Sequence, residues 1–359
     1  MENKQRPKMV HVVEAFGGGV YSFLVDLLNN IIDDYDITVI YALREQTPPN
    51  FLEDFDPRIK FIKSNYMQRS IGINDLKALF EIRKLINSIN PEIVHCHSSK
   101  AGLITRVGIN TKKYKTFYTP HGYSFLMQDC SKIKRFIYKA IEKIGTMNHS
   151  TIIACSKGEY EESLKFTKRA TYVSNGVNLD KLNEYIPETI KDIDTKHLTI
   201  VTTGRISYQK NPELFNKIAE NFQNIKFIWV GTGDLENKLT SKNIEITGWK
   251  TKDELIKILN ESDIFILPSL WEGLPISLLE AMALKKPCIV SNVIGNKDVI
   301  NNNINGFICN DINEFIITIN KILDNKYDLK KISNNAYLDI NNVYNTIAMS
   351  NSYKKVYKI

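Results

Sequence analysis

The sequence predicts an α/β protein built from two doubly wound, parallel-sheet domains that face each other across a cleft. Its 359 residues exceed what one hydrophobic core usually supports. Short apolar strands alternate with turns and helical stretches, and this alternation stops in the polar stretch 187–196 and then begins again. We therefore expect an N-terminal domain over 1–185, a C-terminal domain over 186–340, and a helix over 341–359 that could pack back toward the first domain.

Composition limits the classes of function. The hydrophobic content of 43% and the charged content of 24% are typical of a folded globular protein. No apolar run approaches the ~18–20 residues that span a bilayer, and the N-terminal apolar run is too short for a signal sequence. The 5 cysteines are scattered and form no C-x-x-C pair, which argues against disulfides and a zinc knuckle and indicates a reducing cytosol.

Positive charge is concentrated in the first half of the chain. The net charge is +7, and residues 100–143 contain ten basic residues against two acidic ones, Asp129 and Glu142. A local excess of this kind indicates an anionic surface or an anionic substrate. The basic residues are Lys100, Arg106, Lys112, Lys113, Lys115, Lys132, Lys134, Arg135, Lys139 and Lys143.

The first half follows a pattern of strand, turn and helix. Its first strand ends at the glycine run 17–19, where backbone can approach a phosphate or a sugar closely. The G-x-G-x-x-G spacing of a dinucleotide fingerprint is missing, and the run fits a tight connection equally well. The expected elements are strands 8–15, 36–41, 59–63, 93–96, 116–119, 151–155 and 172–173, and helices 20–30, 73–88, 131–146 and one beginning at 159. The apolar stripe expected on the second helix is Leu76, Leu79, Phe80, Ile82 and Leu85.

Polar residues follow two of these strands. Residues 97–100 come after the strand 93–96, and His121 comes after the strand 116–119 and before Gly122. Open parallel sheets bind ligands at the carboxyl ends of their strands. His121 is therefore a candidate for the functional site, although a structural histidine that caps the strand explains it about as well.

The helix 131–146 combines an apolar face with basic residues. Ser131 can cap its first turn. Such a helix could lie on an anionic membrane, but packing on its own sheet with a solvated lysine face is the commoner arrangement. The apolar residues are Ile133, Phe136, Ile137, Ala140, Ile141 and Ile144.

The second half repeats the pattern and places two cations in one loop. A strand ends at Gly204 and Arg205, and Lys210 precedes a helix that begins at Pro212. From a strand's carboxyl end, these two cations could grip a diphosphate. The other expected elements are strands 227–230, 244–247, 263–268 and 288–291, which lead to Gly231, Gly248–Trp249, Trp271 and Gly295, a helix with a Thr251/Glu254 capping box, and a final helix 344–357.

The stretch WEGLPISLLEAMA at 271–283 follows a buried strand and opens a helix. Glu272 lies at the strand's carboxyl end, and the N–H groups from Gly273 to Ile276 can point into the same crevice. Glu280 follows eight residues later, about two helical turns on. Two carboxylates beside an anion-binding helix start suit a ligand with phosphates and hydroxyls, such as a nucleotide sugar. Solvated glutamates on an ordinary turn are the simpler explanation.

Five motifs, in this order along the chain, resemble those of the retaining glycosyltransferases of family 4. They are FGGGV at 16–20, PHGY at 120–123, SNGVN at 174–178, GRISYQKN at 204–211 and EGLPISLLEAMA at 272–283. The last is similar to the sequence found in bacterial enzymes that make capsule, O-antigen or exopolysaccharide. The resemblance implies the GT-B fold, with an acceptor-binding first domain and a donor-binding second domain, each Rossmann-like.

The resemblance also implies roles for residues at matching positions. Arg205 and Lys210 would neutralise the donor's diphosphate, Glu272 would meet the sugar hydroxyls, and His121 would contact the transferred sugar. No metal and no separate cofactor are expected. The remaining donor-binding residues would be Gly18, Gly19, Gly204, Gly231, Gly248, Trp249, Gly273, Leu274, Pro275, Ile276 and Glu280.

Some positions depart from the family's pattern. Asn296 stands where the family often has a second glycine, and Asp298 where it often has glutamate, so the local sugar or phosphate contacts differ there. Asp-x-Asp triplets at 34–36, 54–56 and 192–194 follow no strand's carboxyl end, and we interpret them as surface loops and not as metal ligands.

Three functions remain open. The leading one is a retaining transferase that moves a hexose or N-acetylhexosamine from a nucleotide-diphosphate sugar, with uridine as the implied base, to a lipid-linked saccharide. It would act in the cytoplasm or at the inner face of the membrane, which residues 100–143 would contact. A related sugar-nucleotide epimerase would isomerise the nucleotide sugar without an acceptor. A non-catalytic partner protein is less favoured, because Arg205, Lys210 and Glu272 are all present. No nucleic-acid partner is expected.

Overall fold

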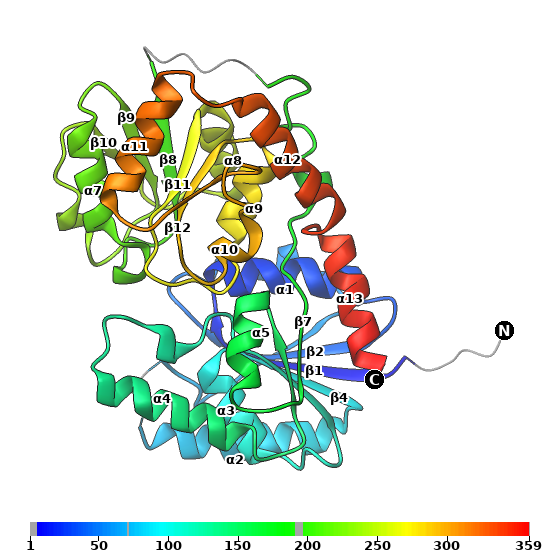
Figure 1. Cartoon of the computed structure of the whole chain (residues 1–359). Helices are drawn as coiled ribbons and strands as arrows, with labels where there is room; N and C mark the ends of the chain where they lie inside the picture. Colours follow the sequence, from blue (N-terminus) through cyan, green and yellow to red (C-terminus); the bar gives the residue numbers. More distant parts are fainter. Residues whose placement is uncertain (1–5, 70–71, 191–196, 359) are drawn as a thin grey trace. The chain divides into compact units, whose positions relative to one another are not determined.

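The computed structural model describes residues 6–69, 72–190 and 197–358, which form two compact units (Figure 1). The chain passes from the first unit to the second at Asn175/Gly176 and returns at Asn345/Thr346, whereas the sequence placed these boundaries at 185/186 and 340/341. The second unit also includes the short segment Met127–Asp129.

The first unit is built around a seven-stranded parallel sheet with the strand order β3-β2-β1-β4-β5-β6-β7. This order reverses direction between β1 and β4, as in doubly wound folds that bind ligands at the carboxyl ends of their strands. The strands are β1 (Lys8–Phe16), β2 (Asp36–Leu43), β3 (Lys60–Lys63), β4 (Ile93–His97), β5 (Lys115–Thr119), β6 (Thr151–Ala154) and β7 (Ala170–Tyr172). The helices are α1 (Gly18–Ile31), η1 (Phe51–Asp54), α2 (Asn74–Ile89), α3 (Ser99–Gly108), η2 (Ser124–Leu126), α4 (Lys132–Gly145), α5 (Lys157–Leu164) and α13 (Thr346–Lys358).

The C-terminal helix α13 is part of the core of this first unit. It packs against α1, and its residues Met349, Tyr353 and Tyr357 are buried among the apolar side chains of α1, β1 and β2. The Phe23 ring of α1 meets the Tyr353 ring edge to face, with 5.7 Å between their centroids. Residues from the end of the chain therefore complete the apolar layer over one face of the first sheet.

The second unit has a six-stranded parallel sheet with the order β10-β9-β8-β11-β12-β13. The central strand β11 is buried along its length, as its uninterrupted apolar sequence requires. The strands are β8 (Thr199–Thr203), β9 (Lys226–Val230), β10 (Ile244–Ile246), β11 (Ile264–Leu267), β12 (Cys288–Ser291) and β13 (Phe307–Cys309). The helices are α6 (Leu179–Leu182), η3 (Tyr208–Lys210), α7 (Pro212–Asn221), η4 (Glu236–Lys238), α8 (Lys252–Glu261), α9 (Ile276–Ala283), α10 (Asn296–Val299), α11 (Ile312–Leu323) and α12 (Leu329–Asn342).

On helix α2 the predicted apolar face is only partly right. Ile82 is buried and Leu79 and Leu85 pack against the core, but Leu76 and Phe80 are 62% and 64% exposed. The buried residues of this helix are Ala78, Ile82 and Ile86. Residues four apart share one face of a helix, so a second stripe was available in the same sequence, and tertiary packing selects it.

On α4 the predicted apolar face is turned outward. The interpretation that it packs on its own sheet is wrong: Ile133 and Phe136 are 74% and 72% exposed, and Ile137 and Ile144 are about half exposed. The helix instead docks through Glu142 and Gly145, which are buried.

A buried ion pair explains how α4 docks. Arg106 donates to Glu142 Oε2 over 3.0 Å, and its guanidinium carbon lies 3.8 Å from the centroid of the Tyr118 ring. The Tyr118 hydroxyl donates to the other oxygen of Glu142 over 2.8 Å. A Cβ at Gly145 would lie 2.5 Å from the guanidinium, so only glycine fits there. Arg106 therefore belongs to the interior and not to the basic surface predicted over 100–143.

Helix α3 is not among the predicted elements, and of its residues only Ser99 and Lys100 belong to the polar segment expected after the strand 93–96. Within the described part of the chain, no helix combines the length and apolar character needed to cross a membrane.

Ser131 caps α4 as predicted, by accepting a hydrogen bond from the Lys134 N–H. The Thr251/Glu254 capping box is also confirmed. The aspartates at 192 and 194 lie outside the described residues.

Candidate active site

The loop after β8 brings Lys210 over the backbone of Gly204. Gly204 has a positive φ of 127°, and a Cβ there would lie 3.2 Å from Lys210 Cε. Asn211 then ends the loop in a left-handed conformation and caps α7 by accepting from the Leu214 N–H over 3.3 Å. The lysine side chain is thus positioned by a glycine beneath it and by a helix start directly after it.

Lys210 is joined to the predicted carboxylate. Its Nζ lies 2.7 Å from Glu272 Oε1, and the two side chains are 16% and 7% exposed. Gln209 Nε2 donates to the Trp271 carbonyl over 2.9 Å and to Glu272 Oε2 over 3.3 Å, and the Leu270 N–H donates to the Gln209 carbonyl over 2.8 Å. These bonds hold the loops after β8 and β11 together and leave the ion pair partly accessible to a ligand.

Arg205 has a different partner. Its Nη2 lies 2.6 Å from Asp234 Oδ2 in the loop after β9, and the Asp234 side chain is 80% exposed. The sequence predicted a shared grip of Arg205 and Lys210 on a diphosphate, but each cation is paired with its own carboxylate in this structure. Because an exposed ion pair is worth little, an anionic ligand could replace Asp234 at small cost.

The segment from Gly273 to Pro275 leads directly into α9. Pro275 occupies the N-cap position without a side-chain cap, so helix geometry leaves the N–H groups of Ile276 and Ser277 without an i−4 carbonyl. The positive end of the helix dipole lies at the same place. Leu274 is buried beside this turn. The start of α9 therefore has the properties of an anion-binding site.

A second turn packs against this one. Gly295 has a positive φ of 86°, and a Cβ there would lie 2.5 Å from the Gly273 carbonyl oxygen. Its N–H donates to Asp298 Oδ2 over 2.9 Å. Asn296 Nδ2 donates to the Ser291 carbonyl and hydroxyl, both over 3.2 Å. Asn296 and Asp298, the two departures from the family's pattern, thus shape the turn that supports Gly273.

Glu280 lies about one turn into α9. Its side chain is buried and forms an ion pair with Lys252 at the start of α8. Gly231 and Gly248, at the ends of β9 and β10, form an antiparallel bridge, and Trp249 beside them is 53% exposed. The structure therefore adds Lys252 to the predicted set. Its signal in the sequence was weak, because a lysine in a first helical turn is usually solvated.

In the first unit, His121 follows β5 in a strained turn. His121 and Gly122 both have positive φ, 55° and 93°. The Gly122 N–H donates to Glu159 Oε1 and the Cys155 N–H donates to Glu159 Oε2, each over 2.7 Å. Glu159 is fully buried, and burial raises the pKa of its carboxyl group. A non-glycine residue in this conformation costs free energy, which the Glu159 clamp offsets.

The glycine run begins α1. Gly17 is the N-cap without a side-chain bond, and Gly18 has a positive φ of 55°. A Cβ on Gly18 or on Gly19 would meet no atom within 4 Å. The space beside the start of this 14-residue helix is therefore open on the first unit, as contact with a ligand would require.

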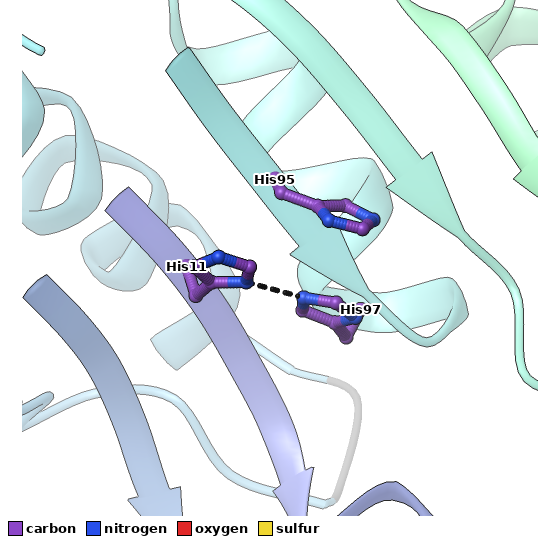
Figure 2. A group of neighbouring side chains, drawn as sticks. All are labelled: His11, His95 and His97. Atoms are coloured by element: carbon purple, nitrogen blue, oxygen red, sulfur yellow. Dashed lines mark hydrogen bonds between the residues drawn. The ribbon is translucent and has the colours of Figure 1, made fainter. Parts of the chain in front are cut away.

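Three buried histidines lie close together (Figure 2), and one of them, His97, contacts His121. His11 lies on β1 and His95 and His97 on β4, and their ring nitrogens offer ligand atoms within 4.8 Å of one another. His11 Nδ1 lies 2.9 Å from His97 Nε2, and His97 Nδ1 lies 3.1 Å from His121 Nε2.

Hydrogen bonds already engage every ring nitrogen of the three histidines. His95 binds the Tyr357 hydroxyl and the Thr119 hydroxyl over 2.8 and 2.9 Å, and His11 Nε2 lies 3.1 Å from the Met9 sulfur. Burial lowers the pKa of His11 to about 3 and those of His95 and His97 well below the ordinary value. The group has the ligand type of a metal site, but a metal ion would have to displace these bonds.

Sequence reasoning missed Glu159, Gln209 and Lys252. Glu159 and Lys252 lie in the first turns of helices, where acidic or solvated side chains are common, and Gln209 lies in the same loop as Lys210. Their contacts with Gly122, Glu272 and Glu280 span 28 to 63 positions, so only the folded chain reveals these contacts.

Two family models match the chain. The model described as Glycosyltransferase Family 4 covers residues 17–181, and the one described as Glycosyl transferases group 1 covers residues 187–339. The two matches divide the chain in nearly the same way as the two sheets do.

Named relatives agree with these models. The chain is 30% identical to an Escherichia coli enzyme named UDP-Gal:alpha-D-GlcNAc-diphosphoundecaprenol alpha-1,3-galactosyltransferase, over 92% of this chain and 90% of that one. It is 26% identical to the Staphylococcus aureus capsular polysaccharide biosynthesis glycosyltransferase CapM, over 78% and 80%. The structure of Anabaena HepE in complex with UDP and glucose superimposes with a TM-score of 0.79, 13% identity and coverage of 98% and 100%. With its two parallel-sheet units, the chain therefore belongs to the family 4 glycosyltransferases of GT-B fold that act in bacterial surface-polysaccharide synthesis.

Proposed function

We propose that this glycosyltransferase moves a hexose or an N-acetylhexosamine from a UDP-sugar to a lipid-linked saccharide, without a metal and with retention of configuration. The Escherichia coli relative, by its name, uses UDP-galactose and an acceptor on diphosphoundecaprenol, and forms an alpha linkage. The Anabaena structure of the same fold holds UDP and glucose. The carrier-linked acceptor would place the enzyme at the cytoplasmic face of the membrane.

The observation that carries this proposal is the Lys210–Glu272 pair beside the start of α9. A diphosphate bound there would meet the Lys210 ammonium, the Arg205 guanidinium and the N–H groups of α9. The Glu272 carboxylate would then be free to accept hydrogen bonds from sugar hydroxyls. Such preorganised donors stabilise the charge that develops on a departing phosphate, which is usually the largest contribution to catalysis.

The chemistry balances without a protein nucleophile. The bond between the sugar's anomeric carbon and the UDP oxygen breaks, and the acceptor hydroxyl forms its bond to the same carbon from the same face. The proton of that hydroxyl passes to the departing phosphate. Lys210 and Arg205 hold the phosphate, Glu272 holds the sugar, and Glu280 accepts hydroxyls of the ribose in place of its bond to Lys252.

The outward face of α4 is an argument that the acceptor is linked to a lipid. Exposed apolar residues alternate there with Lys132, Lys134, Lys139 and Lys143, which are all exposed. An amphipathic helix with an apolar face and basic flanks binds the interface of an anionic membrane. The enzyme would thus meet its acceptor at the membrane surface. The epimerase alternative is not favoured, since the named relatives are glycosyltransferases.

Purified full-length protein tests the proposal directly. Incubation with UDP-hexoses, UDP-N-acetylhexosamines and GDP-mannose, with and without a saccharide-diphospholipid acceptor and with EDTA, should give a glycosylated lipid from one UDP-sugar. The product linkage, read by NMR, should have the configuration of the donor. Isomerised nucleotide sugar without acceptor would indicate the epimerase, and loss of product in EDTA would contradict metal independence.

A further inference from the structure

A single file of hydrogen bonds runs from the interior of the first unit to His121. It begins at the Met9 sulfur and continues through His11 and His97 to His121 Nε2, with distances of 3.1, 2.9 and 3.1 Å between the successive atoms. Met9, His11 and His97 are fully buried, and His121 is partly exposed. Figure 2 shows the bond between His11 and His97, which joins neighbouring strands β1 and β4.

The direction of this file can be deduced from its inner end. A thioether sulfur accepts hydrogen bonds weakly and has no proton to donate, so the His11 Nε2 that faces it must carry the proton. A neutral His11 then has an unprotonated Nδ1, which accepts from His97 Nε2. The same step repeats: His97 Nδ1 is unprotonated and accepts from His121 Nε2.

Each link in the deduction requires neutral imidazoles. Burial lowers the pKa of His11 and of His121 to about 3 and that of His97 well below its ordinary range. At neutral pH each ring therefore carries one proton, and the position of that proton in one ring determines its position in the next.

We propose that the Met9 thioether, acting through His11 and His97, keeps the proton of His121 on Nε2 and so presents Nδ1 of His121 as a hydrogen-bond acceptor. In the described part of the chain, His121 Nδ1 has no hydrogen-bond partner. A group that binds there must donate, as a sugar hydroxyl does and a sugar carboxylate does not. That this group is a sugar hydroxyl of a substrate rests on the proposed function. Met9, His11 and His97 are positioning residues in this scheme.

The file of hydrogen bonds and a metal site exclude each other. A metal ion on His11, His95 and His97 would take ring nitrogens that the file uses, so both cannot exist together. His95 is not part of the file, because its two nitrogens bind the hydroxyls of Tyr357 and Thr119.

Nitrogen NMR of the full-length protein, with ¹⁵N-labelled histidine, tests the proposal. Long-range ¹H–¹⁵N correlation spectra distinguish the two neutral tautomers, and the His121→Asn variant assigns the His121 signals. We expect His11, His97 and His121 all in the Nε2–H form. In Met9→Leu, which keeps the volume of the side chain but removes the acceptor, the Nδ1 signal of His121 should shift toward a mixture of the two forms. In an active preparation, kcat/KM should fall several-fold.

The matched control is Met349→Leu, the same change in the same apolar cluster. It should leave both the His121 signals and kcat/KM unchanged. An Nδ1–H tautomer at His121 in the parent protein would overturn the proposal, even if the Met9 variant failed to fold. Equal spectra for Met9→Leu and Met349→Leu, or one tightly bound metal ion per chain by elemental analysis, would also overturn it. An inactive protein with the expected tautomers would contradict the proposed function and leave this inference standing.

Discussion

The ammonium of Lys210 lies 2.7 Å from the carboxylate of Glu272, 62 positions further along the chain. The two residues meet because β8 and β11 are neighbours in the second sheet and both loops leave its carboxyl edge. Little of either side chain is exposed, so each charge depends on the other when no ligand is present. Removing one partner would leave a poorly solvated charge behind.

Replacing Lys210 by alanine should lower kcat by about 100-fold or more. The physical reason is the loss of a preorganised cation that stabilises the departing diphosphate, a loss worth about 3 kcal/mol. Initial rates at saturating UDP-sugar measure the effect. Lys238→Ala is the matched control, since Lys238 is exposed and pairs with Glu213. Unchanged turnover in Lys210→Ala would argue against the assigned role.

Replacing Glu280 by glutamine should weaken UDP binding about tenfold, or about 1.4 kcal/mol. The reason is that an amide oxygen accepts weaker hydrogen bonds from the ribose hydroxyls than a carboxylate does. Stability should change little, since the Lys252 side chain is 52% exposed. Calorimetric titration with UDP measures the affinity. Glu245→Gln, at an exposed pair with Lys226, is the control and should bind UDP like the parent. If both variants bound UDP equally well, Glu280 would not hold the ribose.

The fold was largely predictable from the sequence because parallel strands buried on both faces are short, apolar and regularly spaced. The two doubly wound domains follow from that pattern, and the GT-B arrangement from the resemblance that the five motifs carry. The face of α2 was only partly predictable, because its apolar residues extend over more than one face of the helix. On α4 the decisive contact is between Arg106 and Glu142, a buried ion pair in residues that composition assigns to the surface.

The local sequence identified the candidate site residues but not the residues with which they form hydrogen bonds and ion pairs. Lys210 and Glu272 each stand in a motif, whereas the bond between them depends on strand order. The clamp of Glu159 on Gly122 spans 37 positions and involves a backbone donor, which carries no sequence signal. His11 and His95 lie on two strands that the sequence predicts. That the two side chains lie on the same face becomes clear only from the pairing of these strands, which sets His11 opposite His95.

Membrane binding should depend on the apolar face of α4. Ile133 and Phe136 are 74% and 72% exposed, and burying such side chains stabilises by about 1.5–3 kcal/mol each. The double variant Ile133→Ser, Phe136→Ser should therefore sediment with anionic vesicles at least tenfold less. Replacing Lys132 and Lys134 by glutamine should also weaken binding, by about 1 kcal/mol per lysine, and added salt should do the same.

The control for this experiment is Ile317→Ser on α11, an apolar residue that is 51% exposed in the second unit. It should bind vesicles like the parent protein. If the parent did not bind anionic vesicles, or bound them regardless of salt and of these substitutions, α4 would not be the membrane contact.

Acid should destabilise the fold through the buried histidines. Burial lowers the pKa of His11 to about 3 and that of His95 well below 6.5, so as the pH falls below about 6.5 the unfolded chain takes up protons that the folded chain does not. Stability is therefore present above about pH 6.5 and is lost as the pH falls, by up to about 1.4 kcal/mol per pH unit for each such histidine.

Urea unfolding at about pH 7 and about pH 5 measures this loss. The raised pKa of Glu159 acts in the opposite sense, so the difference between variants isolates one histidine. In His95→Gln the loss of stability between the two pH values should be smaller than in the parent. In His149→Gln, at an exposed histidine, it should equal that of the parent. Equal losses in all three proteins would show that His95 is not the source.

Replacing Glu159 by glutamine should release the turn that holds His121. Both carboxylate oxygens accept backbone N–H groups, and the amide nitrogen of glutamine would face one of these donors without accepting from it. An unsatisfied buried donor costs about 1–3 kcal/mol, which should appear as a lower urea midpoint. Activity should fall further than stability explains, because His121 loses its strained conformation. The control is Glu162→Gln on the same helix α5, which removes only the ion pair with Lys165. It should keep both the urea midpoint and the activity of the parent protein. Full activity in Glu159→Gln would show that the geometry of His121 is maintained without the clamp.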